Sequence, residues 1–226
     1  MPFPGLADRV AGVRDSIARA AVRGGHGQSV QIVAITKTFG PEAVVAAWEA
    51  GIRCVGENKV QEALAKMEQV SVPVVWHLVG HLQRNKVKHL DRFALFHAMD
   101  SGRLADAIAG RAAEARRRYP VLVQVNASGE ASKGGYELAE VAAEARRLLT
   151  LDGLEVRGVM TMAPFDADDA VLRATFRGCR EALARLQDAG HPASELSMGM
   201  SGDYEVAVEE GATMVRLGTI LFGARD

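Results

Sequence analysis

Cysteine is scarce in this chain, and no histidine pattern points to a metal. Cys54 and Cys179 are the two cysteines in 226 residues, and neither belongs to a CxxC pair. Two cysteines this far apart provide neither a disulfide framework nor the ligands of a thiolate zinc site, so both are excluded. The six histidines show no HExxH spacing, which excludes a zincin, and we expect no metal site.

The chain also lacks an excess of charge of one sign and any long apolar run. A formal net charge of −1 argues against the basic surface that nucleic-acid binding needs. No segment approaches the ~18 consecutive apolar residues of a membrane span. The opening MPFPGLADRV has no basic segment followed by an apolar one, which argues against a signal peptide. We therefore expect a cytoplasmic monomer that contacts neither a membrane nor nucleic acid.

What the sequence does have is a regular alternation of two kinds of segment. Short runs rich in β-branched residues are separated by longer runs rich in Ala, Leu, Glu and Arg, which favour strands and helices respectively. Prominent helices are predicted at Leu6–Arg23, Ser101–Arg118 and Asp166–Ala189. The predicted strands are Val30–Thr38, Ile52–Gly56, Val74–Val79, Ala94–Met99, Val121–Asn126, Leu154–Met162, Leu196–Met200 and Thr213–Leu217.

Eight strands alternating with helices are typical of a (β/α)8 barrel. The alternative is an open doubly wound sheet, which usually carries a GxGxxG turn after its first strand. Here the first strand leads instead into Thr-Lys-Thr-Phe-Gly at 36–40. We therefore predict an α/β fold, a (β/α)8 TIM barrel with an extra N-terminal helix, as a single domain over residues 1–226.

Lys37 is the sharpest candidate for chemistry. Barrel sites lie at the C-terminal ends of the strands, and Lys37 closes an otherwise apolar strand. Partial burial lowers the pKa of a lysine, and a neutral amine is what Schiff-base chemistry requires. The alternative is a lysine that extends its charged end into solvent. If Lys37 points inward, Ile35 and Val33 do so too, because strand side chains alternate.

A second candidate is an anion site in the loops after the last two strands. Ser201 precedes a predicted helix at Tyr204–Glu210, and Gly218 and Thr219 follow the final strand. These loops often bind phosphate in (β/α)8 barrels, and hydroxyls and glycine backbone are suitable donors. The alternative is an ordinary serine cap and a glycine turn.

Four further polar residues have open interpretations. Arg216 shares a strand face with Gly218, and an inward guanidinium needs an acceptor, which could be a ligand atom or an internal acid. Asn58 could contact a ligand or form an Asx turn. His77 and His97 lie inside predicted strands, and we interpret them as core histidines with hydrogen-bond partners.

Several motifs together resemble one family. They are Ala34-Ile-Thr-Lys-Thr38, Val55-Gly-Glu-Asn58, Val60-Gln-Glu62, Trp76-His-Leu-Val-Gly80, Leu82-Gln-Arg-Asn-Lys86, Gly158-Val-Met-Thr-Met162, Leu196-Ser-Met-Gly-Met-Ser201-Gly-Asp203, Val215-Arg-Leu-Gly-Thr219 and Phe222-Gly-Ala-Arg225. With them the chain resembles the pyridoxal-phosphate homeostasis proteins (YggS/PROSC-like), whose barrel is similar to the N-terminal domain of alanine racemase. The chain departs from the family pattern at Lys59, His81, Arg84 and the Lys-Gly-Gly at 133–135.

The resemblance implies a site for the vitamin B6 cofactor pyridoxal 5′-phosphate (PLP). It implies a Schiff base on Lys37, phosphate contacts from Ser201, Gly218 and Thr219, a pyridine nitrogen facing Arg216, and Asn58 against the cofactor. An arginine there keeps the ring nitrogen unprotonated and weakens the ring as an electron sink. The implied function is intracellular PLP homeostasis: the protein buffers PLP or delivers it to PLP-dependent apoenzymes.

Two enzymatic alternatives stay open. One is a low-activity PLP-dependent amino-acid racemase or decarboxylase, whose turnover would disappear in Lys37→Ala. The similar racemases take a tyrosine from a second domain as the opposite-face acid, whereas of Tyr119, Tyr136 and Tyr204 only Tyr136 is expected to reach the barrel mouth. The other is a Schiff-base aldolase, which would be active and colourless. We expect no enzyme and no catalytic residues.

Overall fold

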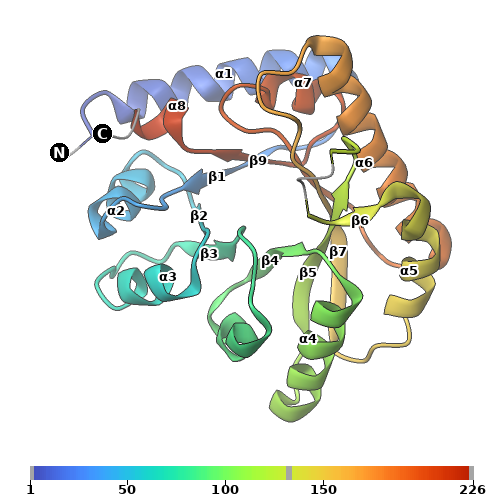
Figure 1. Cartoon of the computed structure of the whole chain (residues 1–226). Coiled ribbons are helices and arrows are strands. Elements are labelled where there is room, and N and C mark those ends of the chain that lie inside the picture. The colour runs from blue at the N-terminus through green and yellow to red at the C-terminus, as the bar shows by residue number, and fades with distance from the viewer. Residues whose placement is uncertain (1–2, 131–133, 224–226) are drawn as a thin grey trace.

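The strands wind into a closed parallel barrel with helices around it (Figure 1). The computed structural model of the protein describes residues 3–130 and 134–223. The strand order is β4-β3-β2-β1-β9-β8-β7-β5, and pairing of β4 with β5 closes the ring. The predicted (β/α)8 barrel is therefore confirmed. Lys133, in the loop after the fifth predicted strand, and Arg225, at the end of the last motif, lie outside the described residues.

All eight predicted strands are present, most of them shorter than predicted. The barrel strands are β1 (Gln31–Ile35), β2 (Cys54–Glu57), β3 (Val75–Leu78), β4 (Leu95–Met99), β5 (Tyr119–Asn126), β7 (Leu154–Met160), β8 (Glu195–Ser197) and β9 (Met214–Leu217). A further strand that was not predicted, β6 (Tyr136–Glu137), is two residues long and pairs with the end of β5. It was wrong to extend the first strand to Thr38, because β1 ends at Ile35 and Lys37 lies in the turn that follows.

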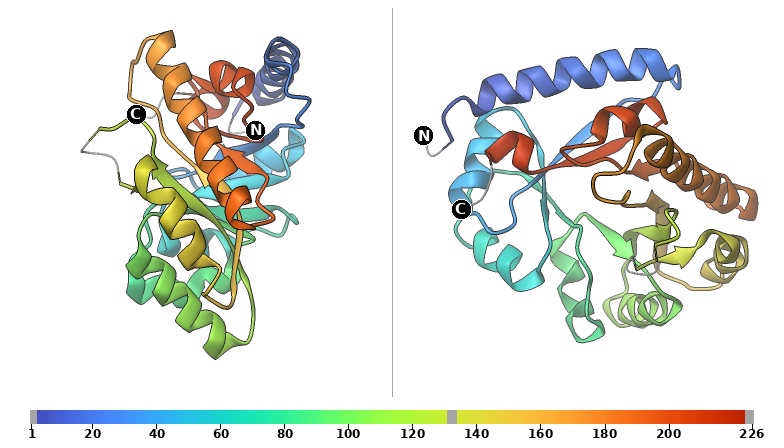
Figure 2. Two further views of the ribbon diagram at one scale, coloured as in Figure 1. Left: turned by 90° about the vertical axis from the view of Figure 1, so that its right-hand side faces the viewer. Right: turned by 45° about the horizontal axis from the view of Figure 1, so that its top comes forward.

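Helices cover the outside of the barrel. They are α1 (Leu6–Gly24), α2 (Pro41–Glu49), α3 (Val60–Met67), α4 (Gly102–Ala115), α5 (Val141–Leu148), α6 (Asp169–Ala189), α7 (Tyr204–Glu209) and α8 (Thr219–Phe222), with 3₁₀ helices η1 (Arg84–Arg92) and η2 (Leu138–Glu140). The predicted N-terminal helix is confirmed as α1, which ends at Gly25 in a left-handed conformation that glycine tolerates. It packs outside the barrel against α7 and α8, as both views of Figure 2 show.

The barrel interior is closely packed, with buried apolar side chains such as Val33 and Ile35 on β1. Gly56 on β2 illustrates how tight it is: a Cβ there would lie 2.7 Å from Ile35 and 3.0 Å from Val33. Both cysteines are buried and unpaired by disulfide. In the part of the chain that the structure describes, no helix is long and apolar enough to cross a bilayer.

Candidate functional site

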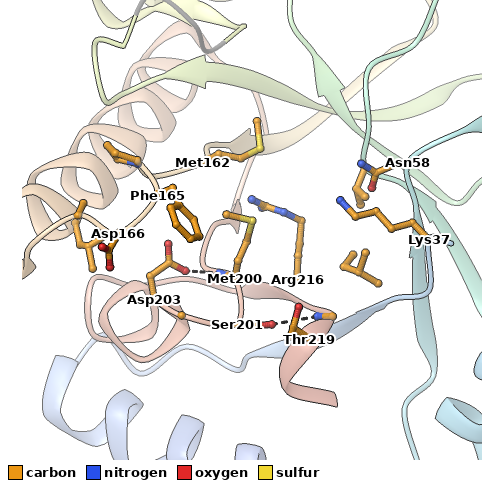
Figure 3. Close-up of a pocket in the computed structure, with 17 residues that line it drawn as sticks. Lys37, Asn58, Met162, Phe165, Asp166, Met200, Ser201, Asp203, Arg216 and Thr219 are labelled. Atoms are coloured by element: carbon orange, nitrogen blue, oxygen red, sulfur yellow. Dashed lines mark hydrogen bonds between the residues drawn. The ribbon is translucent and has the colours of Figure 1, made fainter. Parts of the chain in front are cut away.

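One cavity of about 580 Å³ opens at the C-terminal ends of the strands. All six residues singled out from the sequence line it: Lys37, Asn58, Ser201, Arg216, Gly218 and Thr219. Figure 3 shows Lys37 and Asn58 entering from the β1–β2 side, Ser201 and Thr219 from the β8–β9 side, and Arg216 between them. The fold thus brings together Lys37 and Thr219, which are 182 residues apart in the sequence.

Lys37 is half-buried and faces this cavity. Ile35, two residues earlier, lines the same cavity, so the strand alternation continues through the turn as expected for an inward Lys37. Thr36 points the other way and is fully buried between the barrel and α3. Thr38 has a φ of 70°, which a β-branched residue rarely adopts. The turn that presents Lys37 is therefore conformationally demanding.

The two predicted anion-binding loops meet through Ser201. Its hydroxyl accepts hydrogen bonds from the backbone N–H of Gly218, at 3.3 Å, and of Ile220, at 3.2 Å. Because a hydroxyl has two lone pairs and one hydrogen, Ser201 can make both contacts and still donate its own hydrogen. Thr219 is exposed beside it. This corner of the cavity therefore contains the hydroxyl groups of Ser201 and Thr219 together with the backbone of Gly218.

Arg216 lies at the bottom of the cavity and is buried. Its guanidinium donates to the carbonyl oxygen of Ser197 at 2.7 Å, to the hydroxyl of Ser197 at 2.7 Å and to the carbonyl oxygen of Thr161 at 2.8 Å. Its acceptors within the described residues are thus neutral, not the internal acid considered as an alternative. Burial lowers the pKa of Arg216 to about 10, and Asp203 nearby opposes that shift. The guanidinium stays charged near neutral pH.

The two strand histidines, His97 and His77, extend the hydrogen bonds of Arg216 and Ser197 away from the cavity. Ser197 Oγ lies 2.9 Å from His97 Nδ1, and His97 Nε2 lies 2.9 Å from His77 Nδ1. Both rings are buried, as expected for core histidines. Burial lowers the pKa of His77 to about 4, and burial together with the charges of His77 and Arg216 lowers that of His97. Both imidazoles are therefore neutral near pH 7.

Asn58 follows β2 directly and is backed by Gly80. A Cβ at Gly80 would lie 2.4 Å from the Asn58 carbonyl oxygen and 2.8 Å from its Cα. Only glycine therefore allows the loop after β3 to approach the backbone of Asn58 so closely.

The cavity also has an apolar wall, which was not predicted from the sequence. This wall and its rim are formed by Ile35, Val79, Met162, Pro164, Phe165, Ala167, Leu172 and Met200, with Asp166, Gly202 and Asp203 completing the lining. Phe165 stands at the rim with 97% of its surface exposed. Met162 and Met200 end two of the predicted strands, so applying the strand-end rule to apolar residues would have found them.

No tyrosine lines the cavity, although all three lie in described segments. Tyr136, expected to reach the mouth, is instead buried in β6 and donates its hydroxyl to Glu144 Oε1 at 2.7 Å. Tyr119 bonds to Asp91. Tyr204 lies in α7, with its hydroxyl 3.5 Å from Glu205 Oε1. The expectation that Tyr136 reaches the mouth is therefore wrong, because the short strand β6 turns its ring toward α5.

Comparison with solved structures relates this fold to known barrels. PipY from Synechococcus elongatus PCC7942, solved with PLP bound, aligns with a TM-score of 0.84 and 35% identity over 96% of this chain and 100% of that one. The same protein solved without PLP gives a TM-score of 0.86 at 36% identity. Alanine racemase from Corynebacterium glutamicum aligns with a TM-score of 0.73 at 18% identity, a likeness of fold.

Sequence comparison leads to the same group. The model of the alanine racemase N-terminal domain matches residues 16–226. The pyridoxal phosphate homeostasis protein of Aquifex aeolicus is 40% identical over 96% of this chain and 97% of its own length. That of Escherichia coli K12 is 35% identical over 98% and 97%. This chain therefore belongs to the pyridoxal phosphate homeostasis protein family.

Proposed function

We propose that this protein binds PLP in the cavity between Lys37 and Ser201 and takes part in PLP homeostasis, buffering the cofactor or delivering it. The observation that carries the proposal is that an amine, a buried guanidinium and two hydroxyl-bearing loops line one cavity. PipY, the relative at 35% identity, was solved with PLP bound.

The donor set fits the chemical groups of PLP. Ser201, Thr219 and the Gly218 backbone suit a phosphate, since hydroxyl and amide hydrogens are its usual partners. The Arg216 guanidinium can only donate, so it suits an unprotonated pyridine nitrogen and leaves the ring a poor electron sink. Asn58 and the apolar wall would contact the ring faces. PLP supplies an aldehyde, with which the Lys37 amine condenses reversibly to a Schiff base and one water.

A binding role needs no residue that moves a proton on the face opposite Lys37. All three tyrosines are outside the cavity lining, and the Tyr136 hydroxyl is engaged by Glu144. This arrangement supports buffering or delivery over a racemase-like activity. We extend the proposal to a cytoplasmic monomer that passes PLP to PLP-dependent apoenzymes.

The test is an absorption spectrum of the purified protein before and after borohydride reduction, followed by peptide mapping. We expect a yellow protein whose reduced adduct maps to Lys37. In Lys37→Ala the adduct should be lost while the circular dichroism spectrum is unchanged, because the half-buried Lys37 side chain contributes little to the packing of the core. A protein that takes up no added PLP, or an adduct retained in Lys37→Ala, would reject the proposal.

A further inference from the structure

Behind the turn that carries Lys37 lies an ion cluster formed by the buried residues Glu57 on β2 and Lys66 on α3 and by the partly exposed Glu62 on α3. Lys66 is only 4% exposed. Its Nζ donates to Glu57 Oε1 at 2.6 Å, to Glu62 Oε1 at 3.0 Å and to the Thr36 carbonyl oxygen at 2.7 Å. An ammonium has three hydrogens, so these three contacts use its full donor capacity.

The cluster holds the peptide groups on both sides of Lys37. On the N-terminal side, the Thr36 carbonyl accepts from Lys66, and the Thr36 hydroxyl donates to Glu57 Oε1 at 2.5 Å. On the C-terminal side, the Thr38 backbone N–H donates to Glu62 Oε1. Thr38 is the residue with a φ of 70°. A backbone that a β-branched residue disfavours persists only where its surroundings hold it.

Stability alone does not account for this arrangement. A buried ion pair usually costs as much in desolvation as it gains in attraction, and an apolar side chain in place of Lys66 would be a common solution at a strand–helix interface. Glu57 Oε2 is also buried with no hydrogen-bond partner within the described residues. The cluster therefore retains a costly charged group, and among the described residues every hydrogen bond that it makes outside itself is to Thr36 or Thr38.

We infer that Glu57, Glu62 and Lys66 are positioning residues that fix the direction of Lys37 toward the cofactor aldehyde. This inference rests on the proposed function, because it concerns the Schiff base on Lys37. Glu57 and Glu62 belong to the Val55–Asn58 and Val60–Glu62 motifs, which the cavity residues alone leave unexplained. A fixed turn favours the Schiff base over free aldehyde and amine, because less backbone freedom is lost when the bond forms.

The test breaks the contact on each side of Lys37 separately. Glu62→Ala removes the acceptor of the Thr38 N–H at a partly exposed helix position, whereas Glu62→Gln keeps an acceptor oxygen there. The double variant Glu57→Gln/Lys66→Met removes the Lys66 contact to the Thr36 carbonyl without leaving an unpaired buried charge, and the amide oxygen at position 57 can still accept from the Thr36 hydroxyl. Glu209→Ala is the control, because Glu209 is an equally ion-paired glutamate, bound to Arg23 and Arg173 and outside the cavity lining.

Two ligands separate positioning from general damage. The affinity for PLP depends on phosphate contacts, ring contacts and the Schiff base together. Pyridoxine 5′-phosphate has an alcohol in place of the aldehyde, so its affinity depends on the phosphate and ring contacts alone. We expect Glu62→Ala and the double variant each to bind PLP about tenfold more weakly, as for loss of a hydrogen bond to a charged group, with less adduct trapped on Lys37 by borohydride. Affinity for pyridoxine 5′-phosphate should stay within about twofold. Glu62→Gln should recover most of the loss, and Glu209→Ala should match the wild type.

Three other results would contradict either the positioning role or the proposed function. Unchanged PLP affinity in both Glu62→Ala and the double variant would reject the positioning role. An equal loss for both ligands would show that the cluster supports the cavity as a whole, which also rejects it. A wild-type protein that forms no reducible adduct on Lys37 would instead reject the proposed function, and the inference with it.

Discussion

The guanidinium of Arg216 on β9 donates to both the carbonyl and the hydroxyl oxygen of Ser197 on β8, each at 2.7 Å. Since arginine has no acceptor atom, the Ser197 hydroxyl accepts there, which leaves its own hydrogen available for His97 Nδ1, 2.9 Å away. In the His97 tautomer that accepts this hydrogen, Nε2 carries the ring hydrogen and donates to His77 Nδ1, 2.9 Å away. Arg216, Ser197, His97 and His77 thus form one continuous series of buried hydrogen bonds that begins at the cavity.

Ser197→Ala should therefore disturb the core and the cavity together. The substitution removes an acceptor from Arg216 and the hydrogen-bond partner of His97 Nδ1, both buried, at an expected cost of about 1–3 kcal/mol in the free energy of unfolding. PLP affinity should also fall, because the guanidinium loses one of its three contacts. Urea unfolding and a spectral titration with PLP measure the two effects.

Ser194→Ala is the matched control for that variant. Ser194 is exposed and immediately precedes β8, so its loss should change stability by less than about 0.5 kcal/mol. Equal behaviour of the two variants would mean that the Ser197 hydroxyl contributes nothing to the chain of hydrogen bonds.

The buried histidines should make the protein less stable as the pH falls from about 6.5 toward 4. The unfolded chain takes up protons on histidine near pH 6.5, whereas burial lowers the pKa of folded His77 to about 4. At roughly 1.4 kcal/mol per pKa unit, His77 alone lowers the free energy of unfolding by on the order of 3 kcal/mol across this range. Urea unfolding at pH 7.5, 6 and 5 measures the slope.

His77→Gln isolates this effect from the carboxylates. Glutamine keeps an acceptor for His97 but cannot be protonated, so the variant should lose much of the slope between pH 7 and 5. Carboxylates with lowered pKa values, such as Glu62 and Glu209, lose their contribution only below about pH 4.5. Glu57, whose pKa is raised by burial, acts in the opposite sense but equally in both proteins. Identical slopes would show that His77 does not titrate differently on unfolding.

The barrel and the six cavity residues were accessible from the sequence for a simple reason. Alternation of strand and helix patterns fixes the fold class, and in a parallel barrel all strand ends open onto one rim. Lys37, Ser201 and Arg216 lie at three such ends, so their meeting follows from topology without any distance being known.

The polar contacts beneath that rim depend on geometry that a linear pattern does not carry. Ser197 lies inside a strand, where the sequence alone predicts nothing beyond a small residue. The structure shows that β9 places Arg216 beside it. Lys66 sits among helix-forming residues and would be expected at the surface, yet α3 turns it toward Glu57. The boundary of β1 was overextended because Thr36 and Thr38 are β-branched, while hydrogen bonds to α3 hold Thr38 in a left-handed turn instead.

Ser201→Ala and Thr219→Ala should each weaken PLP binding without preventing Schiff-base formation. A hydrogen bond to a charged phosphate is worth roughly 1.5–3 kcal/mol, or about 10- to 150-fold in dissociation constant. Ser201→Ala should have the larger effect, because Ser201 also accepts from the N–H groups of Gly218 and Ile220 and so shapes the loop. Spectral titration gives the affinity, and borohydride trapping at saturating PLP checks the adduct. Unchanged affinity in both variants would mean that the phosphate binds elsewhere.

Gly80→Ala should weaken the site through Asn58 without touching a ligand itself. The added methyl would meet backbone atoms of Asn58 at 2.4 and 2.8 Å, so one of the two loops must move. Such overpacking costs about 1–3 kcal/mol in stability, and displacement of Asn58 should lower PLP affinity several-fold.

Gly110→Ala in α4 is the control variant, because a Cβ there meets nothing within 4 Å. Relief of glycine's helix penalty should stabilise that variant by about 0.5–1 kcal/mol and leave PLP binding unchanged. The two glycine substitutions are thus expected to change stability in opposite directions, and a Gly80→Ala protein with wild-type affinity would show that Asn58 does not contact the cofactor.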